Sequence, residues 1–433
     1  MTPTRLLPLL AATLALAAPA PGARGQDRPL ALKGATIETV GEAGRIETGV
    51  IVLRDGKIER VGPIDEVEIP EDARVEDASG MTIMPGVVEP AYPFQVPGES
   101  SSSGTRTIII GGRVITLGGS SPTRSPIFTR VADSFDPFRA DFDALLRSGL
   151  THLDLVPPDY GQTAVVRITP DDPDGMLVER DGRLYVSVSN STASLDVVRK
   201  GLEATKPDAP GGGRGRPDGP TGRGRSGGDG ASGRPGGPPS PGSSSADSSR
   251  DLWKAVAEGK APLLADAGNA AAILYLLDAI EDFEDVEVAL IASGSDVYRT
   301  LDRLSGRGGV TLLLRPTIDT MPDNRDRINL PRIAHEAGLD LAFSQGGNRF
   351  GLLSAQDTPL FDVGYLIATG LPREVALEAL TARPADLIGQ GDALGRLEEG
   401  KAASLLVFDG DPFDPYSRLR TVIIAGRTVY ETD

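Results

Sequence analysis

Cysteine is absent from this chain of 433 residues, and histidine occurs only twice, as His152 and His335. Without cysteine the protein can form no disulfide bond, and it has no thiolate to act as a nucleophile or metal ligand. Its stability must therefore come from the burial of apolar side chains. Zinc sites generally take three or four protein ligands, so the two histidines alone cannot complete one.

Basic residues are fewer than acidic residues. The 44 lysine and arginine residues face 61 aspartate and glutamate residues, which gives a formal net charge of -17. Such a surface repels nucleic acid and anionic lipid, so we expect neither as a partner. The hydrophobic share of 39% is typical of a globular protein. The length suffices for one large barrel of about 250 residues with appended modules.

Long apolar runs are confined to the N-terminus. There the basic Arg5 precedes an apolar stretch at residues 6–18, and the small residues Ala23 and Gly25 follow. This stretch is shorter than the roughly 20 residues of a membrane-spanning helix. The pattern is typical of a secretory signal. We therefore expect residues 1–25 to be a signal peptide and the mature protein to be secreted or periplasmic, without a membrane span.

Short strand-like segments gather near both ends of the sequence. They are residues 49–53 and 57–61 near the N-terminus, and residues 404–408, 421–424 and 427–430 near the C-terminus. The Asp55-Gly56 pair between the first two segments favours a two-residue hairpin turn, in which both residues take positive φ angles. Together the two sets predict one small β-domain built from residues 26–85 and 395–433.

The middle of the chain alternates between strand-like and helix-like segments. The strand-like segments are residues 151–156, 262–265, 286–292, 309–314 and 339–343. The helix-like segments are residues 269–283, 296–304 and 330–337, the second with Ser295 as its cap. Alternation of this kind favours a parallel sheet, open or closed into a barrel, over residues 86–205 and 251–394.

One segment differs from the rest in composition. Residues 206–250 consist mostly of glycine, proline, serine and arginine and hold almost no apolar side chains. Such a segment cannot bury enough surface to offset the entropy lost on ordering, so we predict a disordered insertion. Its Gly-Arg pattern also occurs in nucleic-acid-binding segments, but a flexible insertion is the commoner meaning in an exported protein.

Several segments resemble the metal-dependent amidohydrolase family, most closely its imidazolonepropionase-like, extracytoplasmic branch. Residues 77–89 resemble the passage that leads into the family's first barrel strand, and residues 371–389, 395–401 and 409–415 resemble its closing segment. The resemblance implies an α/β fold, a distorted (β/α)8 TIM-like barrel with its metal site at the carboxyl ends of the strands. It also implies a small β-sandwich built from the N- and C-terminal segments.

The same resemblance implies that the metal ligands have been lost. In an active member the first barrel strand ends in two histidines separated by one residue, so that both point to one side of the strand. Ala91 and Pro93 stand at these positions and cannot bind a metal. The other degenerate positions of the metal pocket are Asp266, Gly268, Ser293 and Gln345. We therefore expect no metal cofactor, with zinc as the alternative.

A few polar residues remain as candidates for chemistry. His152, Asp266 and Glu89 are the candidate catalytic residues of a remodelled site. The carboxylates of Glu89, Asp154 and Asp266 would suit Mg²⁺ or Ca²⁺ if they met, but the sequence shows no compact ligand motif. The commoner role for His152 is that of a hydrogen-bonded residue inside a barrel. His335 suits a partly exposed position near a helix C-terminus.

Two functions stay open at this point. We expect an exported, metal-free pseudoenzyme that acts as a binding or assembly module for a small molecule or a protein partner. The alternative is a hydrolase of non-peptide C–N bonds, amidase-like or imidazolonepropionase-like, that uses a remodelled site. Homo-oligomerisation is open in both cases. Convergence of the altered positions at the barrel mouth, with carboxylates and His152 beside them, would favour the hydrolase.

Overall fold

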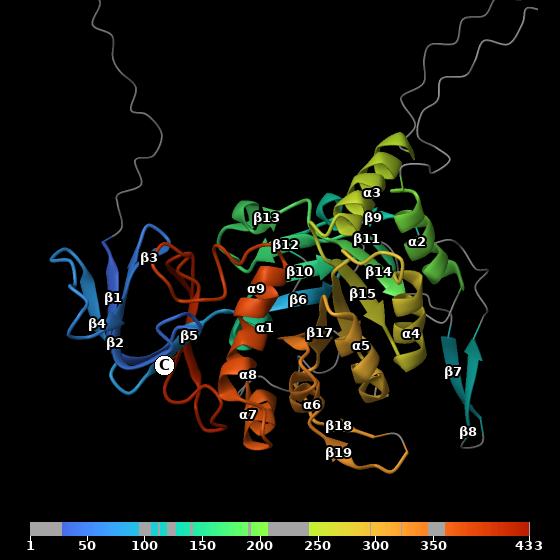
Figure 1. Ribbon diagram of the computed structural model, residues 1–433. Helices are drawn as coiled ribbons and strands as arrows, with labels where there is room; N and C mark the ends of the chain where they lie inside the picture. Colours follow the sequence, from blue (N-terminus) through green and yellow to red (C-terminus); the bar gives the residue numbers. More distant parts are fainter. Residues whose placement is uncertain are drawn as a thin grey trace, which may run out of the picture.

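The computed structural model describes residues 28–94, 105–110, 113–118, 127–138, 142–188, 192–206, 242–294, 296–321, 323–344 and 360–432 (Figure 1). Three predictions fall outside these residues. They concern the signal peptide at residues 1–25, the larger part of the insertion at residues 207–241, and Gln345. All three stay predictions.

Strands from both ends of the chain form one eight-stranded sheet, which we call the terminal sheet (Figure 1). Its strands are β1 (Leu30–Glu38), β2 (Arg45–Arg54), β3 (Lys57–Pro63), β4 (Arg74–Asp77), β5 (Thr82–Pro85), β21 (Leu405–Phe408), β22 (Leu419–Ile424) and β23 (Arg427–Glu431). Their order is β23-β22-β21-β5-β1-β2-β3, with β4 beside β1. The union of the two ends is as predicted. Two stacked layers, as in a sandwich, are not seen among the described strands.

Two hairpin turns of the terminal sheet depend on residues with positive φ. Asp55 and Gly56 join β2 to β3 with φ angles of 50° and 80°, which confirms the predicted Asp-Gly turn. Ala425 and Gly426 join β22 to β23 with φ angles of 49° and 75°. The two turns touch, because a Cβ atom on Gly56 would lie 3.0 Å from the carbonyl oxygen of Ala425. Each turn therefore supports the other.

The rest of the chain forms a mixed α/β unit, which we call the central domain. One of its sheets has the order β13-β12-β10-β6, and a second has the order β20-β17-β16-β15-β14-β11-β9. The bounds are β6 (Val87–Pro93), β9 (Thr129–Arg130), β10 (Leu150–Val156), β11 (Tyr160–Gln162), β12 (Ala164–Arg167), β13 (Leu177–Glu179), β14 (Leu184–Val188), β15 (Leu263–Ala267), β16 (Val288–Ala292), β17 (Val310–Leu314) and β20 (Asp340–Phe343). The strands β14, β15, β16, β17 and β20 run parallel in succession, and β6 runs parallel to β10. The five predicted strands of the middle region are confirmed. Two small hairpins, β7 (Thr105–Ile110) with β8 (Arg113–Gly118) and β18 (Asp319–Thr320) with β19 (Arg327–Ile328), complete the strands.

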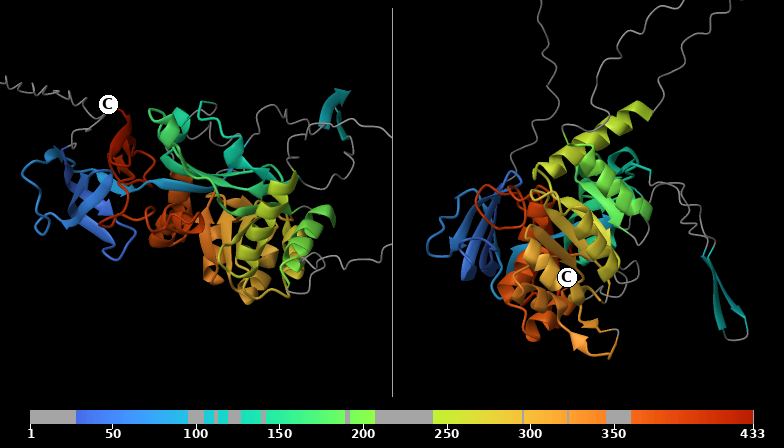
Figure 2. Two further views of the ribbon diagram at one scale, coloured as in Figure 1. Left: turned by 90° about the horizontal axis from the view of Figure 1, so that it is seen from above. Right: turned by 45° about the vertical axis from the view of Figure 1, so that its right-hand side comes forward.

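Most of the helices pack against one face of the seven-stranded sheet, whereas the helix at residues 142–147 contacts β10 of the four-stranded sheet and β23 of the terminal sheet (Figures 1 and 2). Their bounds are α1 (Phe142–Arg147), α2 (Thr192–Glu203), α3 (Gly242–Ala257), α4 (Ala270–Ala279), α5 (Leu301–Arg307), α6 (Leu330–Glu336), α7 (Phe361–Ala368), α8 (Arg373–Leu380) and α9 (Ala382–Leu387). Short 3-10 turns lie at Val131–Asp133, Pro173–Gly175 and Val297–Thr300. Alternate strand residues face the helices, as Leu263 and Ala265 of β15 do when they join the core that contains Ile273 of α4. None of the described helices combines the length and apolarity needed to cross a membrane.

The opposite faces of the two sheets meet in a second, smaller cluster, which we call the apolar interior. Its buried members are Ala91 and Val156 from the four-stranded sheet, and Tyr185, Leu264, Ala289, Leu313 and Ala342 from the seven-stranded sheet. Strands of both sheets therefore surround a common space. Among the described residues the two sheets stay separate, without edge-to-edge pairing into a closed ring. The fold is thus mixed α/β, and closure of the predicted barrel is not shown.

The predicted disordered insertion is too long at its C-terminal end. Residues 242–250 form the first half of α3, a helix of 16 residues. Trp253 and Val256 in the second half are buried, and the Trp253 indole donates a hydrogen bond to the Tyr160 hydroxyl at 2.9 Å. Once a helix is anchored by such contacts, each further turn forms at little cost.

The predicted helix at residues 296–304 starts differently as well. The 3-10 turn Val297–Thr300 precedes α5, and Asp296 stands at the cap position without a capping hydrogen bond. Its carboxylate instead accepts a hydrogen bond of 3.1 Å from the backbone N–H of Ala270, at the start of α4. Ser295, the predicted cap, is not among the described residues.

Candidate functional site

The residues predicted for the site lie on strands whose inner faces meet in the apolar interior, or directly after these strands. They are Glu89, Ala91 and Pro93 in β6, His152 in β10, Asp266 in β15, and Gly268 and Ser293 just after β15 and β16. In parallel α/β sheets, ligands bind at the carboxyl ends of the strands. These positions are therefore the ones to test for convergence.

Ala91 and Pro93 stand where the family resemblance places two histidine ligands. Ala91 is buried, and its methyl group belongs to the apolar interior together with Tyr185 and Leu264. Pro93 is half-buried at the end of β6 and lies opposite Val156 of β10. The space at the end of the first strand is thus packed with hydrocarbon instead of imidazole.

Glu89 is the buried carboxylate of β6, with an exposed fraction of 1%. Its Oε1 atom accepts a hydrogen bond of 2.6 Å from the Ser344 hydroxyl and one of 3.2 Å from the backbone N–H of Ala91. Ser344 directly follows β20, so the first contact ties β6 to the last parallel strand of the other sheet. Glu89 therefore has a structural role in joining the two sheets.

His152 is buried in β10 rather than exposed at a barrel mouth. Its Nδ1 lies 3.1 Å from the Thr151 hydroxyl, and that hydroxyl donates to the carbonyl oxygen of Val87 at 3.2 Å. Nδ1 must therefore be the donor to Thr151. Burial, and secondarily the positive charge of Arg167 on the neighbouring strand, lower the pKa of His152 to about 3. Such an imidazole stays neutral near pH 7 and is too weak a base to activate water.

A buried ion pair that was not predicted joins β10 to the residue ahead of β14. Arg183, just ahead of β14, donates from Nε and Nη2 to the Oδ2 atom of Asp154 in β10, at 3.1 Å and 2.5 Å. Nη2 also donates to the carbonyl oxygen of Pro90 in β6, at 2.6 Å. The two side chains are 6% and 0% exposed. One guanidinium group thus links three strands from both sheets.

Burial works against the ionisation of the Asp154 carboxyl group. Its burial raises its pKa, and the charge and hydrogen bonds of Arg183 oppose that rise. The Oδ1 atom of Asp154 and the Nη1 atom of Arg183 have no hydrogen-bond partner among the described residues. In a buried ion pair with unsatisfied atoms, each charge is stabilised mainly by the other, so the loss of one member leaves the other charge uncompensated.

Asp266 and its neighbours form the more open part of the site. The Tyr185 hydroxyl lies 3.5 Å from Oδ2 of Asp266, at the limit of a hydrogen bond. Burial raises the pKa of the Asp266 carboxyl group. Burial also raises the pKa of Tyr185, with the negative charge of Asp266 adding to it. A Cβ atom on Gly268 would meet nothing within 4 Å, and Ser293 is exposed.

The described members of the predicted site do not come together as a metal site. Among the residues that the structure describes, no three histidine, aspartate or glutamate side chains lie close enough to hold a metal ion. Glu89, Asp154 and Asp266 instead have separate partners in Ser344, Arg183 and Tyr185. A divalent cation bound beside Asp154 would also face the fixed charge of Arg183. The donor set present here does not fit a divalent metal.

Arg183, Ser344 and Tyr185 were missed because their partners lie far away in the sequence. Arg183 is 29 residues from Asp154 and 93 from Pro90, and Ser344 is 255 residues from Glu89. The available signal was an arginine directly after Asp181-Gly182 and ahead of the apolar strand β14. Such a position is usually solvent-exposed, so the signal is weak.

Comparison with known proteins bears on the family. The model of the amidohydrolase family matches residues 352–430. A segment of 78 residues is 32% identical to the allantoinase of Solibacter usitatus (strain Ellin6076), and it makes up 18% of this chain and 16% of that protein. The chain thus shares only about a sixth of the length of this relative, and the likeness concerns one segment.

Solved structures extend the likeness over nearly the whole chain. An amidohydrolase from Thermotoga maritima MSB8 has a TM-score of 0.67 at 18% identity, covering 93% of this chain and 100% of that one. A prolidase complexed with N-methylphosphonate-L-proline has a TM-score of 0.53 at 13% identity, with the same coverage. Molinate hydrolase has a TM-score of 0.51 at 13% identity, covering 93% and 95% of the two chains. At these identities the structures establish the fold alone, and the match to the amidohydrolase family model concerns the C-terminal segment at residues 352–430.

Proposed function

We propose that this protein is a metal-free member of the amidohydrolase family that binds a small molecule or a partner protein instead of catalysing metal-dependent hydrolysis. The Arg183–Asp154 pair is the observation that carries the proposal. This guanidinium group holds a fixed positive charge between β6, β10 and β14, and that charge would repel a divalent cation. In this proposal the strands around the apolar interior are those of a distorted (β/α)8 barrel.

The chemistry of the site supports this assignment. A metal ion lowers the pKa of its bound water to about 7 only when several fixed ligands hold it with an open position. Ala91 contributes a buried methyl group, and Glu89 already accepts two hydrogen bonds from the protein. His152 is neutral and bound to Thr151. None of these groups is available as an inner ligand without rearrangement of the strands.

Elemental analysis of the purified protein after dialysis tests the proposal. We expect no stoichiometric zinc, iron or nickel, and no change in the thermal unfolding midpoint when zinc is added or a chelator is present. The double variant Ala91→His/Pro93→His is a demanding control, since two restored imidazoles still lack the remaining ligands and should not create a site. One tightly held transition metal per wild-type chain would overturn the proposal.

A second candidate function is a metal-independent hydrolase of non-peptide C–N bonds. The observation in its favour is the surroundings of Asp266, a carboxyl group with a raised pKa near the open space beside Gly268. Its test is hydrolysis of amide and lactam substrates in the presence of a chelator. Activity that disappears in Asp266→Asn, and persists in the exposed-surface control Asp282→Asn, would favour this second function over the first.

A further inference from the structure

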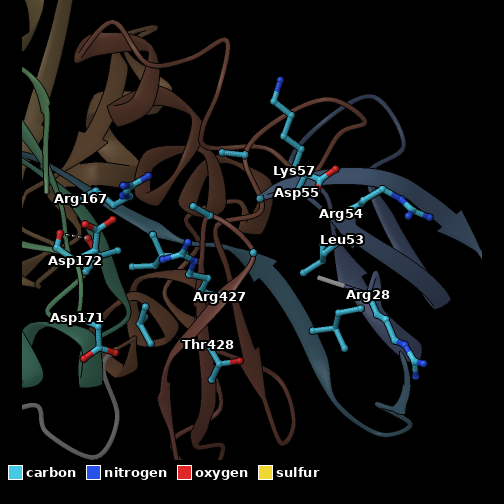
Figure 3. A pocket seen from close by; sticks show the side chains of 18 residues that line it. Arg28, Leu53, Arg54, Asp55, Lys57, Arg167, Asp171, Asp172, Arg427 and Thr428 are labelled. Carbon is cyan, nitrogen blue, oxygen red and sulfur yellow. Dashed lines mark hydrogen bonds between the residues drawn. The ribbon is translucent and has the colours of Figure 1, made fainter. Parts of the chain in front are cut away.

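A groove separates the terminal sheet from the central domain (Figure 3). Its volume is about 690 Å³, which lies within the usual range for small-molecule sites of roughly 300–1,000 Å³. The turn at Asp55-Gly56 and the turn at Ala425-Gly426 form one wall. The end of β12 and the following loop, from Arg167 to Asp172, form the other.

The groove concentrates positive charge in an acidic protein. Its lining holds five cationic side chains, Arg28, Arg54, Lys57, Arg167 and Arg427, against three carboxylates, Asp55, Asp171 and Asp172. Arg54 is paired with Glu59 at 2.8 Å and Asp72 at 3.4 Å. The other four cations form no ion pair with the described residues. In a chain with a net charge of -17, such a group of uncompensated cations is unexpected.

Two arginines face the groove from its opposite walls. Figure 3 shows Arg167 extending from the central domain and Arg427 from the terminal sheet into the space between the two. Arg167 is held in place by a hydrogen bond of 3.0 Å from Nη2 to the carbonyl oxygen of Gly175, and its buried Nε has no partner among the described residues. Arg427 is exposed, with the hydroxyl of Thr428 next to it in the chain.

The carboxylates of the groove form no direct ion pair with these two arginines among the described residues. Asp172 accepts a hydrogen bond of 3.3 Å from the backbone N–H of Gly175 and thereby caps the 3-10 turn Pro173–Gly175. Asp55 and Asp171 lie at the margins of the groove in Figure 3, away from Arg167 and Arg427. The lining as a whole therefore carries more cationic side chains than carboxylates.

We propose that this groove is a binding site for a small organic molecule with at least two oxyanion groups, one for each of Arg167 and Arg427. Guanidinium groups bind carboxylates and phosphates through parallel charge-assisted hydrogen bonds, which makes either oxyanion suitable. A ligand with two such groups spans both walls and so joins the terminal sheet to the central domain. The proposal is independent of the assignment at Asp154 and Arg183, because no residue is shared.

Calorimetric titration of the full chain at low ionic strength tests the site, with citrate and inorganic phosphate as probes and glycerol as the uncharged control. Citrate carries several carboxylates and should bind, more tightly than phosphate, while glycerol should not. Arg427→Gln should weaken citrate binding about tenfold, the loss typical of one charge-assisted contact. Arg60→Gln, an exposed arginine of β3 outside the groove, is the matched control and should leave the affinity within about twofold.

Arg167→Lys provides a second variant that keeps the charge but loses the planar fork of donors. It should also weaken citrate binding about tenfold while its thermal unfolding midpoint shows that it remains folded. Phosphate binding tighter than citrate binding would indicate a phosphate ester as the ligand class and still support the site. Failure of both probes to bind at millimolar concentration, or equal losses in Arg427→Gln and Arg60→Gln, would overturn the proposal.

Discussion

The terminal sheet and the central domain each bury a carboxylate, but they compensate its charge differently. In the terminal sheet Glu38 of β1 receives Arg45 at 2.7 Å and Arg373 at 2.8 Å, and these arginines are 40% and 23% exposed. In the central domain Asp154 is fully buried and is paired with Arg183, which is 6% exposed. Water can replace a lost partner in the first case but not in the second. The access of water to each pair, more than the distance within the pair, should determine how much unfolding free energy is lost when one partner is removed.

Substitution of Arg183, the buried arginine, should cause the largest loss of unfolding free energy. Arg183→Met leaves Asp154 as an unpaired buried charge, which typically costs about 3–5 kcal/mol of unfolding free energy. Arg45→Met in the terminal sheet leaves Glu38 with Arg373 and water, so its cost should stay below about 1 kcal/mol. Chemical denaturation measures both. Equal losses in the two variants would refute the contrast between the regions.

The double variant Asp154→Leu/Arg183→Met sharpens the same point. Replacement of both charges removes the unpaired carboxylate, and buried ion pairs replaced by apolar residues of similar volume often lose little stability. We expect the double variant to be more stable than Arg183→Met alone, with strong coupling between the two positions. Additive losses would show that the pair acts through packing rather than through charge.

The next largest effect should be a loss of stability at low pH, which buried His152 causes. In the unfolded chain a histidine takes up its proton near pH 6.5, whereas burial lowers the pKa of folded His152 to about 3. The unfolded state therefore binds more protons between these values. The unfolding free energy should fall as the pH falls from about 6.5 toward 3, by up to about 1.4 kcal/mol per pH unit. Above pH 6.5 the contribution of neutral His152 to stability is fully present.

His152→Asn isolates this contribution. Asparagine keeps a donor for Thr151 but does not titrate, so the variant should lose less stability than the wild type between pH 6.5 and pH 5. Asp154 and Asp266 have raised pKa values, so their effect is opposite in sign, and it is common to both proteins. Parallel pH profiles for the two proteins would contradict the burial of a neutral His152.

A smaller effect is expected for the hairpin turns of the terminal sheet. Gly56→Ala places a Cβ at a φ of 80° and 3.0 Å from the Ala425 carbonyl oxygen. Gly44→Ala places one at a φ of 60° with nothing within 4 Å. The left-handed conformation alone costs about 1–2 kcal/mol. Both variants should therefore have a lower thermal unfolding midpoint than the wild type, with the midpoint of Gly56→Ala lower than that of Gly44→Ala. The reverse order would mean that the two turns do not support each other.

The smallest effect is expected in the segment between α2 and α3. Residues 207–241 hold almost no apolar side chains, so a Gly-Ser segment of equal length should change the unfolding free energy by less than about 0.5 kcal/mol. The helix α3 must be left intact, because Trp253 and Val256 are buried. A loss of several kcal/mol would show that the replaced segment contributes to a core.

Sequence reasoning succeeded where the signals were local. The turn at Asp55-Gly56 could be predicted because these two adjacent residues readily take positive φ angles. The strands β15, β16 and β17 could be predicted because they are apolar runs between turn signals. The helix α4 was also found, and Asn269 caps it by accepting a hydrogen bond of 2.9 Å from the N–H of Ala272. In each case the chemistry acts within a few residues of the chain.

The site was only partly predictable, because its contacts are distant in the sequence. Ala91 at a ligand position could be identified from the family resemblance, and its methyl group is buried among apolar side chains. The convergence of Arg183 on Asp154 and Pro90 depends on how β14 meets β6 and β10, and no local pattern specifies that. The start of α3 was also missed, because its first residues carry a disordered composition and gain their order from buried Trp253.

The pairing of β5 with β21 has a consequence for how the chain is made. Met84 lies opposite Leu406, so the partner strand of β5 is synthesised only after the central domain. Until then β5 offers an unpaired edge of buried, apolar residues, the kind of edge that attracts other strands. The terminal sheet therefore remains incomplete while the central domain is synthesised.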